Sequence, residues 1–294
     1  MTLQNLLHWA SDKGKFLTIA DYAVFCKEYL QFVYDGLQAV IVSQNENNYR
    51  FFQYKEDAAF AVTRPINSEL MLSAEEFDGA YDLFRMSLSH MRDLRQDAEA
   101  RKMINRFVYT CQQSIGATLD ALPAGESNRA RKINGDLFER YIRCIMIDMG
   151  IDVSEGTIRV PVIVDGEEQF FMSYQHDLIV KSEGQLKAIG SVKTSSKDRI
   201  DKIFVDKFLY NRLTDSNTPH FAIFLNDVQR KGREPNYGVN TTFLTGHYKG
   251  YTVKLNPLDG VYYCDMRPIM HTDPILSQTI RTLDYLLVED IWEF

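Results

Sequence analysis

Residues 173–213, SYQHDLIVKSEGQLKAIGSVKTSSKDRIDKIFVDKFLYNRL, decide the fold. Residues 174–181 form an extended, bulky run, Glu183-Gly184 supplies a turn, and residues 186–193 form a second extended run. An apolar pattern at helical spacing follows. The stretch therefore predicts a strand, a tight turn, a second strand and a helix.

A carboxylate and an ammonium group belong to this hairpin. Asp177 interrupts an otherwise apolar strand, and the hairpin can bring it near Lys193. Ser191 and Lys193 share one face, because successive strand residues point to opposite faces. Charges at the end of a buried hairpin are costly to desolvate unless they are paired or bind a metal ion. We therefore expect the chemistry of the protein here.

The arrangement resembles the nuclease core of the PD-(D/E)XK superfamily. In that core one strand carries an Asp, and the next carries an acid and a Lys two residues apart. Asp177 and Lys193 match this pattern, whereas Ser191 stands in the place of the second acid.

The residues after Lys193 narrow the resemblance to the EcoRII-type restriction endonucleases. In that group the second acid has moved to the following helix, where Asp206 stands in this chain, thirteen residues beyond Lys193. A Lys/Arg–Asp/Glu–Arg cluster, matched here by Lys197-Asp198-Arg199, reads CC:GG base pairs in the group.

A further match lies upstream, in Asn134-Gly135-Asp136-Leu137-Phe138-Glu139. The same endonucleases carry a Glu at this point of their first core helix, which Glu139 matches. We expect Asn134 to cap that helix. The resemblance covers about residues 127–230.

The resemblance implies a Mg²⁺-dependent type II endonuclease that cuts double-stranded DNA at a site containing CC/GG. The implied metal ligands are Asp177, Asp206 and Glu139, with Lys193 as the fourth catalytic residue. The implied DNA contacts are Lys197, Asp198, Arg199, Arg230, Lys231 and Arg233. For the last three, a role in surface solubility is an equal alternative.

The resemblance to restriction endonucleases also implies protein partners. A palindromic site is normally read by a two-fold symmetric protein, so a homodimer is the expected minimum and a tetramer stays open. A cognate DNA methyltransferase would protect the host DNA.

Two other functions stay open. One is a protein on the same fold that binds specific DNA without cutting it. The other is a DNA-repair or junction nuclease, which would need no base-reading cluster. Metal-dependent cutting separates the first from an enzyme, and sequence-specific products separate the second from a restriction enzyme.

Composition and charge bear on the kind of protein and on how it could contact nucleic acid. The chain has 294 residues, 45% of them hydrophobic, and a net charge of −7. This charge argues against coating nucleic acid non-specifically, yet residues 181–233 hold eleven Lys/Arg against six acidic residues. A local basic surface on an acidic body suits phosphate contact, although a solvated, charge-rich helix face is the simpler interpretation.

The location of the protein is expected to be the cytoplasm. No run of eighteen apolar residues occurs, and the first residues lack the basic-then-apolar order of a signal peptide. The four cysteines are widely spaced, which favours reduced core residues over a disulfide framework or a zinc site.

We expect an α/β fold with two regions divided near residues 123–128. Residues 126–294 would form the nuclease core, a mixed central sheet flanked by helices. Residues 1–125 would form a mainly helical region for dimerisation, DNA binding or another accessory role. Further expected elements are helices at 3–35, 73–95, 99–122 and 275–291, a hairpin at 37–43 and 49–54, and strands at 58–62, 221–226 and within 239–265.

Overall fold

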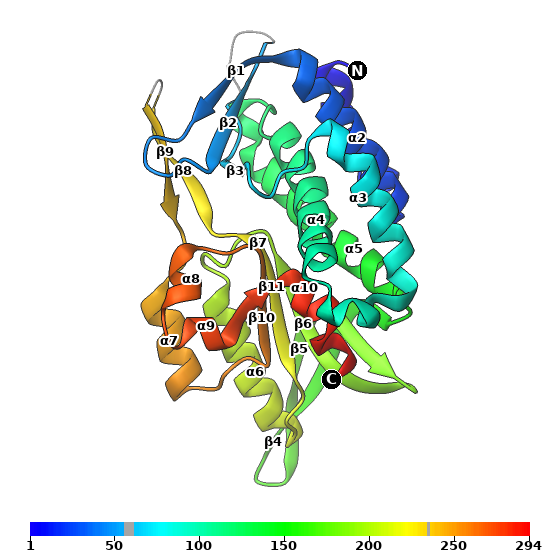
Figure 1. The fold of residues 1–294 in the computed structure, drawn as a ribbon. Coiled ribbons are helices and arrows are strands. Elements are labelled where there is room, and N and C mark those ends of the chain that lie inside the picture. The colour runs from blue at the N-terminus through cyan, green and yellow to red at the C-terminus, as the bar shows by residue number, and fades with distance from the viewer. Residues whose placement is uncertain (56–61, 234–235) are drawn as a thin grey trace.

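A computed structural model describes residues 1–55, 62–233 and 236–294. A six-stranded sheet in the order β11-β10-β7-β6-β5-β4 forms its centre (Figure 1). The strands are β4 (Asp152–Val164), β5 (Glu167–Ser182), β6 (Gln185–Lys193), β7 (His220–Asn226), β10 (Gly260–Asp265) and β11 (Ile280–Thr282). β4, β5 and β6 pair antiparallel, whereas β6, β7, β10 and β11 pair parallel. The predicted mixed sheet is confirmed.

Helices cover both faces of this sheet. On one face lie α4 (Ala98–Leu119), α5 (Ser127–Asp148) and α10 (Leu283–Val288), whose apolar residues share one core with Val192, Phe221 and Tyr262 of the strands. On the other face lie α6 (Ile200–Thr214) and α7 (Thr245–Lys254), with α8 (Pro268–Thr272) and α9 (Leu276–Thr279) beside them. β7 is buried along its whole length, as a central parallel strand covered on both sides must be.

The N-terminal region consists of helices and a small sheet. Its helices are α1 (Leu3–Ser11), α2 (Ile19–Gly36) and α3 (Ala74–Ser87), and its sheet has the order β1 (Leu37–Val42), β2 (Tyr49–Tyr54), β3 (Ile66–Asn67). Ser73 and Glu76 form a capping box at the start of α3, within the helix expected over 73–95. Short 3₁₀ turns occupy Lys13–Lys15, Leu88–Gln96, Ala124–Glu126 and Asp290–Trp292.

A hairpin of β8 (Val228–Arg233) and β9 (Asn236–Thr241) packs against this small sheet. Tyr237 and Val239 of β9 form one apolar cluster with Tyr49 and Phe51 of β2. The backbone N–H of Gln44 also donates to the carbonyl of Tyr237 at 3.0 Å. The N-terminal region therefore reaches the central sheet through this hairpin as well as through its helices.

The apolar core is continuous across the boundary expected at residue 125. Phe16 and Phe84, far from the sheet in sequence, belong to the same cluster as Phe138 of α5 and Phe221 of β7. All four cysteines are free, and three of them are buried.

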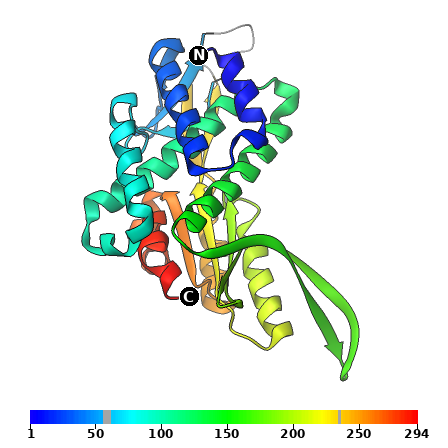
Figure 2. The ribbon, with the colours of Figure 1, turned by 90° about the vertical axis from the view of Figure 1, so that its right-hand side faces the viewer.

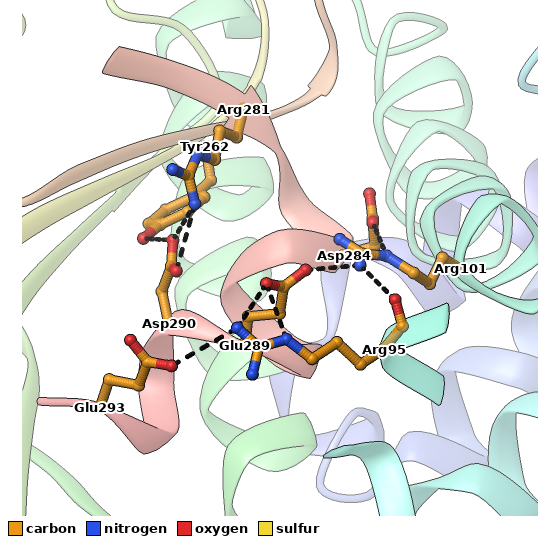
Figure 3. Close-up of polar contacts among 8 residues, drawn as sticks. All are labelled: Arg95, Arg101, Tyr262, Arg281, Asp284, Glu289, Asp290 and Glu293. Atoms are coloured by element: carbon orange, nitrogen blue, oxygen red, sulfur yellow. Dashed lines mark hydrogen bonds and ion pairs between the residues drawn. The ribbon is translucent and has the colours of Figure 1, made fainter. Parts of the chain in front are cut away.

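An ion-pair cluster joins α4 to the end of the chain (Figure 3). Arg101 is buried and lies 2.8 Å from Asp284 and 2.5 Å from Glu289. Ion pairs offset part of the cost of burying a guanidinium, so these carboxylates hold the C-terminal segment against α4.

The β4–β5 hairpin extends beyond the body of the protein as an arm (Figure 2). Asp165 and Gly166 turn it with positive φ angles of 52° and 83°. The turn between β5 and β6 uses Glu183 and Gly184, also at positive φ, as a two-residue hairpin of the type I′ kind requires.

Four sequence predictions are wrong in detail. The helix expected over 3–35 breaks near Asp12, whose side chain accepts from the N–H of Gly14. Asn134 does not cap α5, because the helix begins at Ser127 and Asn134 is buried within it. The segment 239–265 contains α7, a helix that was not expected.

The last of these predictions concerns residues 275–291, which are not one helix. The short strand β11 interrupts them, because its backbone pairs parallel with β10. Of the strand expected at 58–62, residues 58–61 lie outside the described residues, and Val62 forms a single bridge with Gln53. Among the described ranges, no helix is long and apolar enough to cross a membrane.

We expect His220 to make stability depend on pH. Its Nδ1 lies 2.9 Å from the carbonyl of Thr218, and burial lowers the pKa of His220 to about 4. The unfolded chain has the ordinary pKa of about 6.5, so it binds the proton more readily. The stabilisation is therefore complete above about pH 6.5 and is lost as the pH falls towards 4.

Urea denaturation at pH 7 and at pH 4.5 tests this. The wild type should lose about 2 kcal/mol more unfolding free energy between these pH values than His220→Gln does. His271→Gln, at an exposed position, is the control and should follow the wild type. Equal losses in wild type and His220→Gln would contradict the prediction.

Candidate active site

Three elements bring their side chains to one place, beside the end of β6. Asp177 comes from β5, Lys193 ends β6, and Glu139 comes from α5. The Lys193 Nζ lies 2.6 Å from the Asp177 Oδ2 and 2.6 Å from the Glu139 Oε1. Three of the four predicted catalytic residues therefore meet around one ammonium group.

At Asp177 the regular backbone pairing of β5 with both neighbouring strands is interrupted, and the side chain is bonded to β6. The ladder between β5 and β6 runs from the turn to the pair Leu178–Gly190 and ends there. On the other side, a bulge sets three residue steps of β5 against two of β4, between Ile179 and His176. The Asp177 Oδ2 accepts the N–H of Val192 at 2.8 Å, so the carboxylate takes the place of a strand carbonyl.

The three side chains are partly buried and still reachable from solvent. Their exposed fractions are 14% for Asp177, 25% for Glu139 and 29% for Lys193. A bound molecule could therefore contact these groups with little solvent between the charges, which strengthens electrostatic interactions.

The charges of the cluster shift its pKa values. Burial disfavours the ammonium form of Lys193, but Asp177 and Glu139 outweigh it, and the pKa of Lys193 is raised. Burial and the nearby charge of Asp177 raise the pKa of Glu139, although Lys193 acts in the opposite direction. The two acids repel each other, and their charges favour the ammonium form of Lys193 between them.

Among the described residues, Asp206 makes no hydrogen bond or ion pair with this cluster. It forms an ion pair with Lys202, one turn earlier on α6. It raises the pKa of buried His176 by its charge, although burial dominates and leaves that pKa below the ordinary value. Ser191 is half-buried on β6 and pairs in register with Ala222 of β7. The structure does not bring Asp206 to Asp177 and Glu139 as the resemblance implied.

The oxygen donors of the cluster suit a hard cation. Among the residues that the structure describes, no group of three or more His, Cys, Asp or Glu could hold a metal ion. Mg²⁺ does not require such a cage, because it commonly binds one or two carboxylates, water and substrate phosphate oxygens. Asp177 and Glu139 supply that minimum.

The Lys197–Arg199 turn is exposed and precedes α6. All three side chains face solvent, and Asp198 has a positive φ of 57°. This left-handed conformation is uncommon outside glycine and is held only where neighbours determine it.

Asp227, which was not among the predicted site residues, anchors the two serines that directly precede this turn. Asp227 is fully buried directly after β7, and its carboxylate accepts from the hydroxyl of Ser195 at 2.8 Å and from the N–H of Ser196 at 3.0 Å. It also accepts from the hydroxyls of Ser196, Thr242 and Tyr263. An acid that follows an apolar parallel strand directly is the signal that could have found it.

The same carboxylate ties the turn to the β8–β9 hairpin, because Asp227 and Thr242 flank that hairpin. Lys231 and Arg233 are exposed along β8. Arg230 lies over the Tyr237 ring, 5.5 Å from its centre, and donates to the carbonyl of Val62 at 2.5 Å. Arg230 is exposed like Lys231 and Arg233, but it also holds β8 to the N-terminal region.

Comparison with known proteins bears on this geometry. No family model matches the chain, and no curated protein matches its sequence. A solved structure, the type IIP restriction endonuclease Kpn2I, matches with a TM-score of 0.71 and 18% sequence identity over 99% of this chain and 97% of that chain. The chain has a restriction-endonuclease fold. The match extends over the N-terminal region as well as the central sheet, so this fold includes both regions.

We expect Asp227→Asn to loosen the Lys197–Arg199 turn within this restriction-endonuclease fold. An amide in place of the carboxylate leaves buried donors without acceptors, each at a cost of about 1–3 kcal/mol. Limited trypsin digestion should then cut after Lys197 and Arg199 severalfold faster than in the wild type, as mass spectrometry of the fragments would show.

Asp290→Asn provides the matched control. Asp290 also accepts from a buried tyrosine hydroxyl of the sheet, that of Tyr262 at 2.7 Å, but has no contact with the turn. Equal digestion of the two variants would remove Asp227 as the anchor of the turn.

Proposed function

We propose that the protein is a type II restriction endonuclease that cuts double-stranded DNA at a site containing CC/GG, with Mg²⁺ as cofactor. The observation that carries the proposal is Lys193 held 2.6 Å from both Asp177 and Glu139, on a restriction-endonuclease fold. The three groups come from β5, β6 and α5, in the order along the chain that the resemblance implied.

The proposed reaction is hydrolysis of a phosphodiester bond. It needs an attacking water, neutralisation of the phosphate charge and help for the leaving oxygen. Bound Mg²⁺ would lower the pKa of a water and neutralise developing negative charge. Asp177 and Glu139 would hold it, and both present oxygen atoms at the end of β6.

Lys193 acts in this proposal as a cation. Its raised pKa keeps the ammonium protonated near neutral pH, so it stabilises charge on the phosphate and orients the water with its N–H groups. Asp206 enters as the fourth catalytic group and a third metal ligand, and reaching the metal requires release of its ion pair with Lys202.

The Lys197–Arg199 turn is proposed as the base reader. In the major groove guanine presents two acceptors, O6 and N7, and cytosine presents the N4 donor. Lys197 and Arg199 would take adjacent guanines, and Asp198 would accept from the opposing cytosines. All three are exposed on a turn that buried Asp227 holds, which favours base reading over a flexible phosphate contact. Arg230, Lys231 and Arg233 of β8 are proposed as additional DNA contacts.

A palindromic CC/GG site implies a homodimer with one half-site per subunit. A cognate DNA methyltransferase is the proposed functional partner, and the cytoplasm is the proposed location. Size-exclusion chromatography with light scattering would report the subunit number directly.

Asp177→Ala and Lys193→Ala should abolish cleavage and leave specific DNA binding largely intact. These groups act mainly on the transition state, so their loss lowers the cutting rate more than the affinity. The measurement is digestion of bacteriophage DNA with Mg²⁺, with sequencing of the ends and a parallel gel-shift assay. Ser191→Ala is the control on the same strand and should cut well, whereas Asp206→Asn should cut poorly. A wild-type cutting rate in Asp177→Ala or in Lys193→Ala would remove the catalytic assignment.

Arg199→Ala should weaken binding of the specific site about ten- to hundredfold, since each good base contact is worth about 1–3 kcal/mol. Binding to unrelated DNA should change little. Fluorescence anisotropy with matched specific and non-specific duplexes measures both affinities. Arg212→Ala, in the last turn of α6, removes an exposed arginine at the other end of the same helix and is the control. An Arg199→Ala loss that is equal for all sequences would contradict base reading.

A further inference from the structure

The face of α5 that leads to Glu139 carries an arrangement that catalysis alone does not require. Gly135 and Arg131 lie one and two turns before Glu139, and Asn128 lies in the first turn. At 1.5 Å per residue, Gly135 is about 6 Å and Arg131 about 12 Å along the helix from Glu139. We call Asn128, Arg131 and Gly135 the α5 track.

Gly135 leaves this face of the helix open. A Cβ added there would meet no atom within 4 Å, so no packing neighbour within the described protein requires a glycine. A glycine inside a helix is unfavourable relative to alanine, and close approach of a ligand to the backbone is one of its established uses. Open space alone is not decisive, because Gly79 of α3 is equally open. Its position one turn from Glu139 distinguishes Gly135.

Arg131 supplies charge to the same face. It is exposed, and among the described residues no ion pair involves it. The acid on this part of the helix, Asp136, is balanced by Lys13 at 2.7 Å and Lys132 at 3.1 Å. The beginning of α5 therefore presents the exposed guanidinium of Arg131, an unobstructed helix surface at Gly135 and an acid, Asp136, that two lysines balance. These features lie on the same helix as Glu139 of the cluster around Lys193.

We propose that the α5 track binds the sugar–phosphate backbone of the strand that Lys193 and its carboxylates act on. This inference rests on the proposed function and deepens it, because it names the surface that delivers the scissile phosphate. Arg131 would contact a phosphate, Asn128 would donate a hydrogen bond, and the backbone would pass closely over Gly135. Contacts of this kind set register and orientation without reading sequence.

The test uses full-length protein with Asp177→Ala as the parent, so that DNA is bound without being cut. A fluorescent duplex is titrated with the parent and with Gly135→Leu or Arg131→Ala in the parent background. Gly135→Leu should weaken binding at least about tenfold, because its side chain fills the space that the phosphates need. Arg131→Ala should reduce the slope of log affinity against log salt concentration by about one, as the loss of one phosphate contact predicts.

Gly79→Leu and Arg85→Ala are matched controls on α3, a helix that packs on α2 and α4. Gly79 is open like Gly135, and Arg85 is exposed like Arg131. Both controls should bind as the parent does. Circular dichroism should show Gly135→Leu folded, with a melting temperature at or above that of the parent, since the substitution improves helix propensity.

The outcomes separate this inference from the function it rests on. A parent that binds the duplex while Gly135→Leu binds it equally well overturns the α5 track alone. An equal loss in Gly79→Leu overturns it too, since the effect would not belong to α5. A parent that fails to bind duplex DNA removes the proposed function, and the α5 track with it.

Discussion

The interaction on which the site depends is the pair of hydrogen-bonded ion pairs that Lys193 makes with Asp177 and Glu139. Two carboxylates drawn together in a partly buried place repel each other, and burial opposes the charge of each group. The ammonium group offsets this repulsion only because β5, β6 and α5 converge at one point. The geometry is therefore costly for the isolated elements and is maintained by the packing of α5 on the sheet.

A second buried charge organises the surface next to the site. Asp227 accepts five hydrogen bonds from four residues, and within the part of the chain that the structure describes no ion pair involves it. Hydrogen bonds to the charged form compensate for its desolvation. Because the donors come from the Lys197–Arg199 side of β6 and from the base of the β8–β9 hairpin, one carboxylate sets the relative position of both. The cluster around Lys193 and the exposed turn thus lie near the ends of the same parallel strands.

The N-terminal region packs directly against the elements that carry the cluster and the turn. Its helices share the apolar core of α5 and β7, and its small sheet supports the β8–β9 hairpin. Arg101 adds a polar tie to the C-terminal segment. Glu139 lies on α5, which packs against this region, so the N-terminal half of the chain stabilises the position of one carboxylate of the cluster.

Much of the central hairpin could be predicted from the sequence by itself. Bulky residues bounded by Glu183-Gly184 determine β5 and β6, because a two-residue turn with positive φ angles leaves few other registers. The candidate residues Asp177 and Lys193 follow from that register, and Glu139 followed from a resemblance in NGDLFE. The boundaries of α5 could not be predicted in this way. Asn134 is a good capping residue, but it is buried within the helix and contacts Gln112 of α4.

Only the tertiary structure decided what depends on contacts between distant residues. β11 extends because β10 offers an unpaired edge, which overrides the helical pattern of residues 275–291. Asp206 pairs with Lys202 on its own helix, a local contact at i,i+4 spacing, and only the fold shows that this side chain is not bonded to Asp177. Asp227 gained its role from serines more than thirty residues earlier in the chain. Local sequence determines which dihedral angles and turns are favourable, whereas the partners of a buried charge are determined by which surfaces pack together.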